Sequence, residues 1–228
     1  MCGRYTITVS LEELVVRFAM DRSSFPYYRP KYNVAPGQLI TAIIHDGERN
    51  RAGELKWGLV PAWANDSKIG FTMINARSES LAQKPAFRTP LERKRCLIPA
   101  DSFYEWKAAE GGSAKQPMRV MLKNGALFAM AGLYDTWVTP EGSKLSTCTI
   151  ITTDANELVG GIHPRMPVIV RPEDEAAWLD RSNRDTNGLL QLLKPYPAEQ
   201  MRAYPVNAKV GNVKNDTPEC IEEIPMLF

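Results

Sequence analysis

Cys2 directly follows the initiator methionine, so removal of one residue leaves an N-terminal cysteine with a free α-amine. The amine and the thiol of such a residue lie on adjacent carbon atoms, so both can add to one carbonyl carbon and close a five-membered thiazolidine ring. Ring closure is intramolecular, and well-oriented intramolecular reactions reach effective molarities of about 10⁵ M or more. Cys2 can therefore capture an aldehyde once Met1 has been removed. The alternative is an ordinary cysteine that happens to occupy the second position.

Three other polar residues stand in contexts that suit proton transfer or hydrogen bonding. Glu105 lies among aromatic residues at positions 103, 104 and 106, whose apolar rings are expected to raise the pKa of its carboxyl group. His163 lies in a rigid turn of glycine and proline close to Arg165, and histidine titrates near neutral pH. Asn75 follows an apolar run and presents an amide beside an arginine at position 77. Each of these residues alone is also compatible with a structural role.

Aromatic residues in proline-containing segments suggest a surface for unpaired nucleic acid bases. Trp57 and Trp63 enclose the sequence Gly-Leu-Val-Pro-Ala, and Asn33 and Pro36 lie in an Asn-Val-Ala-Pro-Gly loop. Aromatic side chains stack on unpaired bases at about 1–3 kcal/mol per base, and arginines neutralise phosphates. The alternative is that these tryptophans belong to the core.

The composition is typical of a globular protein and narrows the range of functions. The 228 residues are 44% hydrophobic and 24% charged. The start of the chain lacks the pattern of a signal peptide, and no segment approaches the ~20 apolar residues of a membrane span. The four cysteines form no Cys-x-x-Cys pair and only two histidines are present, so we expect no metal and no other cofactor.

The net charge of +2 is divided unevenly along the chain. Residues 1–120 carry 18 Lys and Arg against 12 Asp and Glu, whereas residues 121–228 carry 10 against 14. The resulting charges of +6 and −4 permit an anionic ligand on the N-terminal half, although a bias of this size is also common on a solvated surface.

The elements that must position these residues are mainly strands. Short β-rich segments alternate with turn residues, which predicts an α+β fold with a mainly antiparallel sheet, curled or barrel-like, and flanking helices. Asn124-Gly125 is typical of a type I′ turn and predicts a hairpin between the apolar runs on either side. The predicted strands are 4–9, 39–45, 55–59, 72–74, 96–98, 119–122, 126–133, 146–152 and 168–170.

Helices are expected to be fewer. Ser10-Leu11-Glu12-Glu13 has a capping-box pattern and predicts a helix that ends near Met20. Further helices are predicted to start at 154–157, to cover 172–179 and to include 189–193. No repeat or linker divides the chain, so residues 1–228 are expected to form one domain, and a monomer is expected.

Eight ordered segments together resemble the signature blocks of the SRAP family (SOS response-associated peptidase). Ser102 departs from this pattern, because the family more often has glycine at that position, and only the local loop geometry is put in doubt. The segments are Met1-Cys2-Gly3-Arg4-Tyr5, Tyr32-Asn33-Val34-Ala35-Pro36-Gly37-Gln38, Trp57-Gly58-Leu59-Val60-Pro61-Ala62-Trp63, Ile74-Asn75-Ala76-Arg77-Ser78-Glu79, Arg95-Cys96-Leu97-Ile98-Pro99-Ala100, Phe103-Tyr104-Glu105-Trp106, Ala131-Gly132-Leu133-Tyr134 and His163-Pro164-Arg165-Met166-Pro167.

The resemblance implies the SRAP fold and covalent capture of abasic sites in single-stranded DNA, with Cys2-dependent removal of Met1. An abasic deoxyribose opens to an aldehyde, which is the electrophile that the aminothiol requires. The family's active-site positions match Cys2, Asn75, Glu105 and His163. His163 is expected to assist sugar-ring opening, Glu105 to shuttle protons, and Asn75 to orient the amine or a sugar hydroxyl. A cytoplasmic protein that associates with the nucleoid when bound to DNA is expected.

The contacts to the DNA strand are expected from two groups of residues. Arg4, Arg77 and Arg165 are candidates for the phosphates that flank the lesion. The strand channel is expected to be shaped by four further residues, namely Asn33, Pro36, Trp63 and Trp106.

Two other functions fit some of the same residues. A conventional cysteine peptidase acting on other proteins would use Cys2 as nucleophile, His163 as base and Glu105 to orient the base, and it would need no free N-terminus. A non-catalytic reader of modified DNA would bury Cys2 and bind DNA in a salt-sensitive way without a covalent product.

Overall fold

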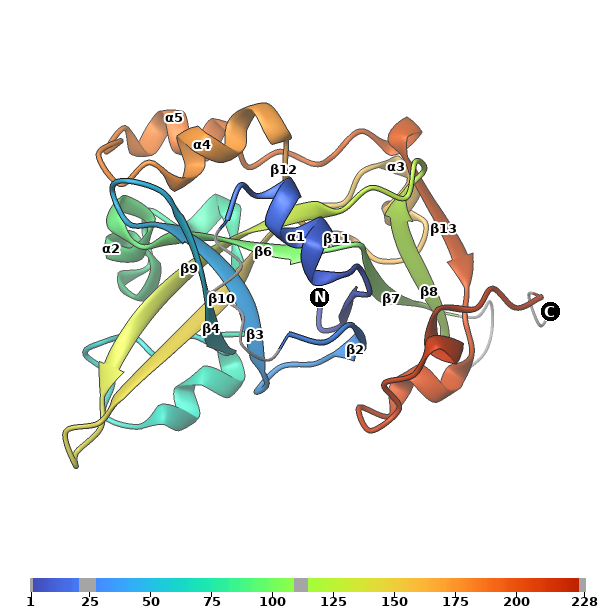
Figure 1. Cartoon of the computed structure of the whole chain (residues 1–228), viewed down its shortest axis with the longest axis horizontal. Helices are drawn as coiled ribbons and strands as arrows, with labels where there is room; N and C mark the ends of the chain where they lie inside the picture. Colours follow the sequence, from blue (N-terminus) through green and yellow to red (C-terminus); the bar gives the residue numbers. More distant parts are fainter. Residues whose placement is uncertain (1, 21–27, 109–114, 226–228) are drawn as a thin grey trace.

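The computed structural model describes residues 2–20, 28–108 and 115–225. It is a mixed α+β fold of two sheets with a few short helices, and the N-terminal segment (blue) lies near the middle of the molecule in Figure 1. The strands are β1 Tyr5–Ile7, β2 Lys31–Val34, β3 Leu39–His45, β4 Asn50–Trp57, β5 Asn75–Arg77, β6 Arg95–Ala100, β7 Ser102–Ala108, β8 Lys115–Leu122, β9 Phe128–Val138, β10 Lys144–Asp154, β11 Arg165–Pro167, β12 Ile169–Val170 and β13 Met201–Pro205.

The larger sheet closes on itself. The strand order β10-β4-β3-β6-β9 returns to β10, because β10 pairs in parallel with β4 and antiparallel with β9. β10 also pairs in parallel with β5 and antiparallel with β11, and β12 pairs with β9. Closure of this kind removes free strand edges. It confirms the prediction of a mainly antiparallel, barrel-like core.

The smaller sheet has the strand order β13-β8-β7-β1-β2. Tyr5 pairs with Phe103 and with Val34, so β1 lies between β7 and β2. In Figure 1 β7, β8 and β13 lie on the right of the molecule, and β3, β4, β6, β9 and β10 of the larger sheet lie on the left. The N-terminal strand is therefore an internal strand, which fixes the position of the residues that precede it.

The helices cover the sheets and carry the caps that their sequences indicate. In α1, Ser10 and Glu13 form the predicted capping box, with the Glu13 N–H donating to the Ser10 hydroxyl at 3.2 Å. Asn156 caps α3, whose start was predicted. The α-helices are α1 Leu11–Arg17, α2 Pro85–Arg93, α3 Glu157–Gly160, α4 Glu175–Leu179 and α5 Thr186–Gln191. The 3₁₀ helices are η2 Ser67–Thr72, η3 Ser78–Ser80, η4 Pro172–Asp174, η5 Ala198–Gln200, η6 Ala208–Gly211 and η7 Pro218–Ile221.

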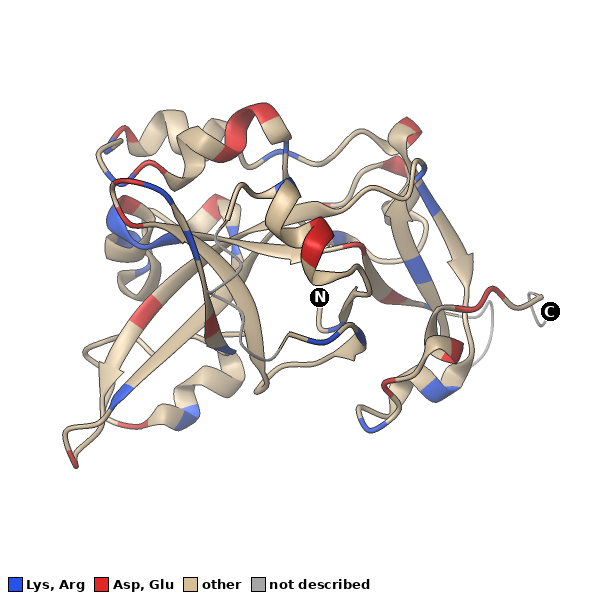
Figure 2. Ribbon diagram, in the orientation of Figure 1, with Lys and Arg blue, Asp and Glu red and all other residues tan. Residues whose placement is uncertain are grey.

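The core is one large hydrophobic cluster that extends through both sheets. Cys2, Tyr5 and Trp57 belong to it, so the N-terminal segment is part of the core and not a surface strand. A smaller cluster on the other face of β7 contains Tyr104, Tyr204 and the half-buried Trp106. Figure 2 shows basic and acidic residues on most elements of both sheets. No helix in the described part of the chain is long and apolar enough to cross a membrane.

Three local predictions are wrong. Asn124-Gly125 forms a turn with Gly125 at φ 69°, but β8 and β9 on either side of it belong to different sheets and do not pair with each other. The strand predicted at 72–74 is replaced by the end of η2, and the strand β5 begins at Asn75. The first helix ends at Arg17, before Met20. Local sequence patterns do not contain the contacts between distant segments, such as the pairing of β8 with β13 and of β5 with β10, that accompany these differences.

Candidate active site

Cys2 is positioned by the extension of β1 along β7. The backbone N–H of Tyr104 donates to the Arg4 carbonyl oxygen at 3.0 Å, which continues the pairing of β1 toward the N-terminus. The pairing brings Cys2 alongside the segment that contains Glu105 and Trp106. Cys2 is 0% exposed. A cysteine at this place is thus held inside the molecule by regular strand pairing.

The thiol of Cys2 and the carboxyl group of Glu105 form the centre of the site. Burial raises the pKa of the Cys2 thiol, the charge of Glu105 raises this pKa further, and a hydrogen bond from the Arg4 backbone lowers it. Glu105 is 2% exposed, and burial raises the pKa of its carboxyl group to about 7. A carboxyl group with a pKa near neutrality can both accept and donate a proton at physiological pH.

The predicted cause of the raised pKa of Glu105 needs one correction. Adjacent side chains of a strand point to opposite faces. Tyr104 and Trp106 accordingly pack in the smaller cluster, and Phe103 shares the large core with Cys2. The burial of Glu105 therefore comes from the core between the sheets, and not from three aromatic neighbours along the chain.

Asn75 is the first residue of β5 and pairs with Ile150 of β10. Its Nδ2 donates to the Ile150 carbonyl oxygen at 3.4 Å. Its Oδ1 is buried and has no hydrogen-bond partner among the described residues. Buried amide oxygens are rarely left in this state. The Oδ1 atom is therefore available to a donor such as an amine or a sugar hydroxyl.

Tyr5 and Trp57 connect Cys2 with Asn75. The two rings contact each other with centroids 5.6 Å apart, and Trp57 Nε1 donates to the carbonyl oxygen of Ile74 at 2.8 Å. Burial raises the pKa of Tyr5, and the charges of Cys148 and Cys2 raise it further, so Tyr5 lies close to both thiols. Trp57 is thus a core residue, as the alternative interpretation held.

His163 follows α3, and its ring is held by the backbone of Arg165. The His163 N–H donates to the Val159 carbonyl oxygen at 2.8 Å. His163 Nδ1 lies 3.1 Å from the Arg165 backbone nitrogen and 3.2 Å from the Arg165 carbonyl oxygen, so the Arg165 backbone holds the ring at this nitrogen. Burial lowers the pKa of His163, the hydrogen bond with the Arg165 backbone raises it, and the charges of Lys115 and Arg165 lower it; the net shift is downward. Since Lys115 begins β8, His163 faces the β7–β8 hairpin that carries Glu105.

The predicted DNA contacts fall into two groups in the structure. Arg77 is exposed and Trp63 is 59% exposed, so both are accessible to a ligand. The guanidinium of Arg4 donates to Asn33 Oδ1 at 2.8 Å and to the Val210 carbonyl oxygen at 2.6 Å. The Nδ2 atom of Asn33, which is 1% exposed, lies within hydrogen-bond distance of the same Val210 carbonyl oxygen and of those of Asn212 and Asn215.

The remaining three predicted contacts have distinct surroundings. Trp106 is half-buried with the Arg4 guanidinium 5.9 Å from its ring centroid. Pro36 is half-buried and lines a small apolar pocket of about 90 Å³. Arg165 is bound by two carboxylates, those of Glu79 and Asp154.

Phe71 is an exposed aromatic residue that the sequence analysis missed. It is 74% exposed and lines the pocket of Pro36. The pocket depends on a close backbone approach, because a Cβ atom on Gly58 would lie 2.6 Å from the Gly70 carbonyl oxygen. An isolated aromatic residue after a glycine carries no periodic signal, so only the two glycines could have pointed to it.

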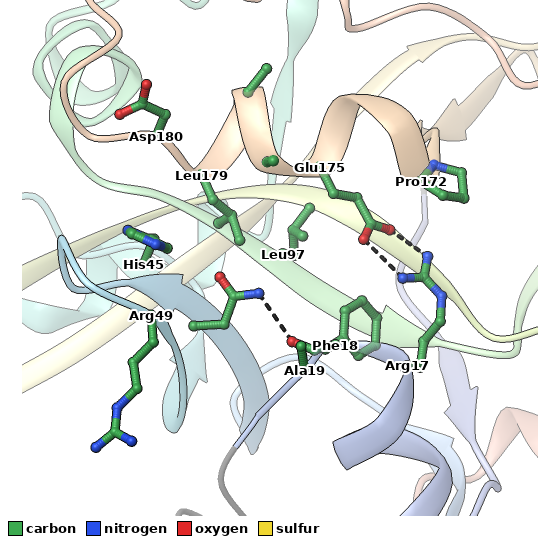
Figure 3. A pocket seen from close by; sticks show the side chains of 13 residues that line it. Arg17, Phe18, Ala19, His45, Arg49, Leu97, Pro172, Glu175, Leu179 and Asp180 are labelled. Carbon is green, nitrogen blue, oxygen red and sulfur yellow. Dashed lines mark hydrogen bonds and ion pairs between the residues drawn. The ribbon is translucent and has the colours of Figure 1, made fainter.

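A second hollow of about 850 Å³ lies between α1, the β3–β4 hairpin and α4 (Figure 3). Figure 3 shows the Arg17 and Glu175 side chains facing each other across it, with Arg17 Nη2 2.6 Å from Glu175 Oε1. None of the predicted site residues lines this hollow. Within the described ranges there is also no cluster of His, Cys, Asp and Glu that could hold a metal ion.

Comparisons with known proteins identify relatives over the whole chain. The abasic site processing protein YoqW of Bacillus subtilis (strain 168) is 54% identical over 224 residues, which cover 97% of this chain and 99% of that protein. The abasic site processing protein HMCES of Gallus gallus is 36% identical, with 99% of this chain and 79% of that protein covered. A crystal structure of a Bacteroides thetaiotaomicron protein has a TM-score of 0.87 at 27% identity, with 98% of this chain and 100% of that chain covered.

The family assignment follows from the extent of these matches. The model of the family described as SOS response associated peptidase (SRAP) matches residues 1–213, which include every predicted site residue. The resemblance inferred from eight sequence blocks is thereby confirmed. The chain belongs to the SRAP family.

Proposed function

We propose that this protein processes abasic sites in single-stranded DNA by forming a covalent crosslink through Cys2 after Met1 has been removed. The observation that carries the proposal is the position of Cys2 alongside β7, where its thiol lies within the electrostatic influence of Glu105, a carboxyl group with a pKa of about 7. The names of the relatives, abasic site processing proteins, supply the substrate class. The family name supplies the setting, a DNA damage response.

The proposed reaction forms two bonds to C1′ and releases one water molecule. The Cys2 amine adds to the aldehyde of the opened sugar, and the resulting carbinolamine loses its hydroxyl group as water to give a Schiff base. The Cys2 sulfur then adds to the same carbon atom while its proton passes to the nitrogen, which closes the thiazolidine ring. A stable ring protects the lesion from strand cleavage by β-elimination.

Glu105 is the proposed proton shuttle. A buried thiol with a raised pKa needs a base as it attacks, and the Glu105 carboxylate is the nearby group with a pKa suited to that transfer. Before this step the protonated carboxyl group can donate to the departing hydroxyl of the carbinolamine. One carboxyl group therefore serves both proton transfers in turn.

His163 and Asn75 are proposed to act on the sugar. The His163 ring, held at Nδ1 by the Arg165 backbone, is proposed to deliver a proton to the ring oxygen as the sugar opens. The free Oδ1 of Asn75 can accept from the Cys2 amine or a sugar hydroxyl and so fix the direction of attack. An amide is suited to this orienting role because it does not titrate.

The strand is proposed to cross the exposed face that contains Arg77, Trp63 and Pro36. Arg77 offers an exposed positive charge to a phosphate, and Trp63 offers a ring on which a base can stack. Arg4, Asn33 and Trp106 are proposed to shape the channel through the segment that they hold around Val210. Binding of this kind places the protein on the nucleoid when lesions are present.

Intact-protein mass spectrometry after incubation with a single-stranded oligonucleotide containing an abasic site tests this function. Processed wild-type protein is expected to gain the mass of the oligonucleotide minus one water, in a product stable to heat. Cys2→Ser can form a Schiff base but no thiazolidine, and an N-terminal extension that retains Met1 blocks both steps. Cys220→Ser is the matched control, because Cys220 lies in the smaller cluster away from Cys2.

The outcomes separate the three functions considered. Absence of the adduct in processed wild-type protein would overturn the proposal. A stable adduct with Cys2→Ser or with the extended protein would overturn the thiazolidine mechanism. Cleavage of added peptides by the extended protein supports a conventional cysteine peptidase instead, and salt-sensitive binding without an adduct supports a reader of modified DNA.

Removal of Met1 is proposed to depend on Cys2 as well. In this step the Met1–Cys2 peptide bond is hydrolysed, with one water molecule consumed and methionine released. Cell-free synthesis without methionine aminopeptidase isolates the self-processing route. Loss of Met1 from the wild type but not from Cys2→Ala is the expected result, and retention in both would assign the removal to an external enzyme.

A further inference from the structure

The guanidinium of Arg165 is held between two carboxylates that come from different elements. Arg165 Nη1 and Nη2 donate to Glu79 Oε1 and Oε2 at 2.7 and 3.0 Å, and Nη1 also donates to Asp154 Oδ1 at 2.6 Å. The Arg165 side chain is 12% exposed, whereas Glu79 is 50% and Asp154 is 82% exposed. The pair with Glu79 is bidentate, which fixes the plane of the guanidinium as well as its distance.

Contacts within the protein occupy the four Nη hydrogens of Arg165. The fourth Nη hydrogen bonds with the Thr152 carbonyl oxygen at 2.8 Å. The fifth donor, Nε, is buried and has no hydrogen-bond partner among the described residues. A phosphate that approaches from solvent would have to displace a carboxylate. The geometry therefore favours a role for Arg165 inside the protein.

Arg165 is the residue that holds the His163 ring. Its N–H lies 3.1 Å and its carbonyl oxygen 3.2 Å from His163 Nδ1. Arg165 is also the first residue of β11, paired with Asp154 at the end of β10. Strand β11 has only three residues and so few backbone hydrogen bonds. The side-chain contacts of Arg165 therefore help to fix the start of β11, where the Arg165 backbone contacts the His163 ring.

Glu79 connects this end of β11 to the segment of Asn75. It lies two residues beyond Arg77, whose strand β5 runs along one edge of β10, while β11 runs along the other edge. Thr152 of β10 pairs with both Arg77 and Pro167. The Glu79–Arg165 ion pair thus crosses β10 and ties the two edges together near the site.

We propose that Glu79 is a positioning residue that holds Arg165 and, through the Arg165 backbone, the His163 ring for the sugar-opening step. This inference rests on the proposed function. The charges of Lys115 of β8 and Arg165 of β11 lower the pKa of His163. Glu79 of η3 and Asp154 of β10 form ion pairs with Arg165. Glu79 offsets the Arg165 charge, so its neutralisation is expected to lower the pKa of His163 and to loosen the ring.

The test compares Glu79→Gln with Asp154→Asn, which neutralises the other carboxylate on the same guanidinium. Proton NMR titration follows the two imidazole rings of the protein, and His45 serves as the internal reference in every sample. Single-turnover crosslinking to an abasic single-stranded oligonucleotide gives the maximal rate and the half-saturating DNA concentration. Glu79→Asp retains the charge with a shorter side chain and reports rescue.

Glu79→Gln is expected to lower the maximal rate about tenfold, with less than about twofold change in the half-saturating DNA concentration. It is also expected to lower the pKa of His163. Asp154→Asn is expected to change the rate less than about threefold, because its contact is a single hydrogen bond on an 82% exposed side chain. Partial recovery by Glu79→Asp is expected.

Two results would overturn the inference. An unchanged maximal rate and an unchanged His163 titration in Glu79→Gln would show that the ion pair does not position the ring. A change confined to the half-saturating DNA concentration and its salt dependence would assign Arg165 to phosphate binding instead. If the wild type forms no crosslink, the proposed function fails, whereas the NMR titration still reports whether Glu79 acts on His163.

Discussion

The two sides of the site are held by carboxylates in opposite environments. On the Cys2 side, Asp101 is 4% exposed and accepts from the hydroxyl of Thr6 and from the N–H and hydroxyl of Thr8, both at 2.5 Å. Arg119 Nη2 lies 3.7 Å from the same carboxylate. On the His163 side, the carboxylate of Glu79 that holds Arg165 is 50% exposed. Each carboxylate fixes the end of a strand, but Asp101 lies inside the protein and Glu79 faces solvent.

This difference indicates which half of the site is rigid. Electrostatic interactions are stronger and less screened by salt inside a protein than at its surface. Strand β1, which follows Cys2, is therefore held by interactions that salt screens little. The loop of His163 depends on an ion pair that salt or a nearby phosphate can weaken. Cys2, the proposed nucleophile, is thus held by buried interactions, and His163, which is proposed to act on the sugar, is held by an ion pair that faces solvent.

The largest expected effect is on the buried side. Asp101→Ala leaves the Arg119 charge and the hydroxyl groups of Thr6 and Thr8 without their shared acceptor, and removal of one partner from a buried ion pair costs about 3–5 kcal/mol. Urea denaturation measures this loss in the free energy of unfolding. Asp101→Asn retains one acceptor oxygen and is expected to lose about 1–3 kcal/mol. Equal losses of less than 1 kcal/mol in both variants would contradict the contrast between the two sides.

The pH dependence of stability should have opposite signs on the two sides. The pKa of Glu105 is raised from 4.5 to about 7 in the folded protein, so the folded state binds more protons between these values and stability falls as the pH rises through them. Relative to Glu105→Gln, the wild type is expected to lose about 3 kcal/mol between pH 4.5 and pH 7. Urea denaturation of both proteins across this range checks the sign and the size.

Glu79 provides the opposite case. The hydrogen bond from Arg165 lowers the pKa of Glu79, so its contribution to stability is present above the unfolded pKa and is lost as the pH falls through the folded pKa. Because the side chain is 50% exposed, less than about 1 kcal/mol is expected. At about 1 M salt the difference between wild type and Glu79→Gln should fall by half or more. The difference in the free energy of unfolding between wild type and Asp101→Asn should stay constant as salt is added. If it declined as much as the difference for Glu79→Gln, the two carboxylates would not differ in their screening by salt.

The smallest effect is expected from Asp154→Asn. Asp154 Oδ1 accepts a single hydrogen bond from Arg165, and the side chain is 82% exposed. A change of less than about 0.5 kcal/mol in thermal or urea unfolding is expected. A loss as large as that in Glu79→Gln would mean that the two carboxylates share the role assigned here to Glu79.

Local signals in the sequence predicted those features that depend on neighbouring residues. The strand Leu39–His45 and the capping box of Ser10 and Glu13 follow from periodicity and short-range hydrogen bonding. The strands β2, β7, β11 and β13 were missed. β2 and β13 are short and next to prolines, whereas the aromatic run in β7 was recognised only as a motif.

The roles of the arginines show where sequence reasoning stops. Arg4 bonds with Val210 across 206 positions, and Arg165 bonds with Glu79 across 86. An arginine in a motif indicates that a negative or polar partner is needed, but not whether the partner is a phosphate or another part of the same chain. The pairing of Cys2 with Glu105 was accessible because the family motif named both residues.

The burial of Cys2 also sets a time limit on its maturation. An external aminopeptidase must draw the Met1–Cys2 bond into its own active site, which is feasible only while the start of the chain is undocked. Cys2 docks against the strand that contains Glu105, so about 100 further residues must leave the ribosome first. At about 5–20 residues per second, synthesis of these residues takes roughly 5–20 s, and an aminopeptidase must remove Met1 within this time. Under the proposed mechanism, a chain that keeps its methionine beyond this interval would have to remove it by its own chemistry.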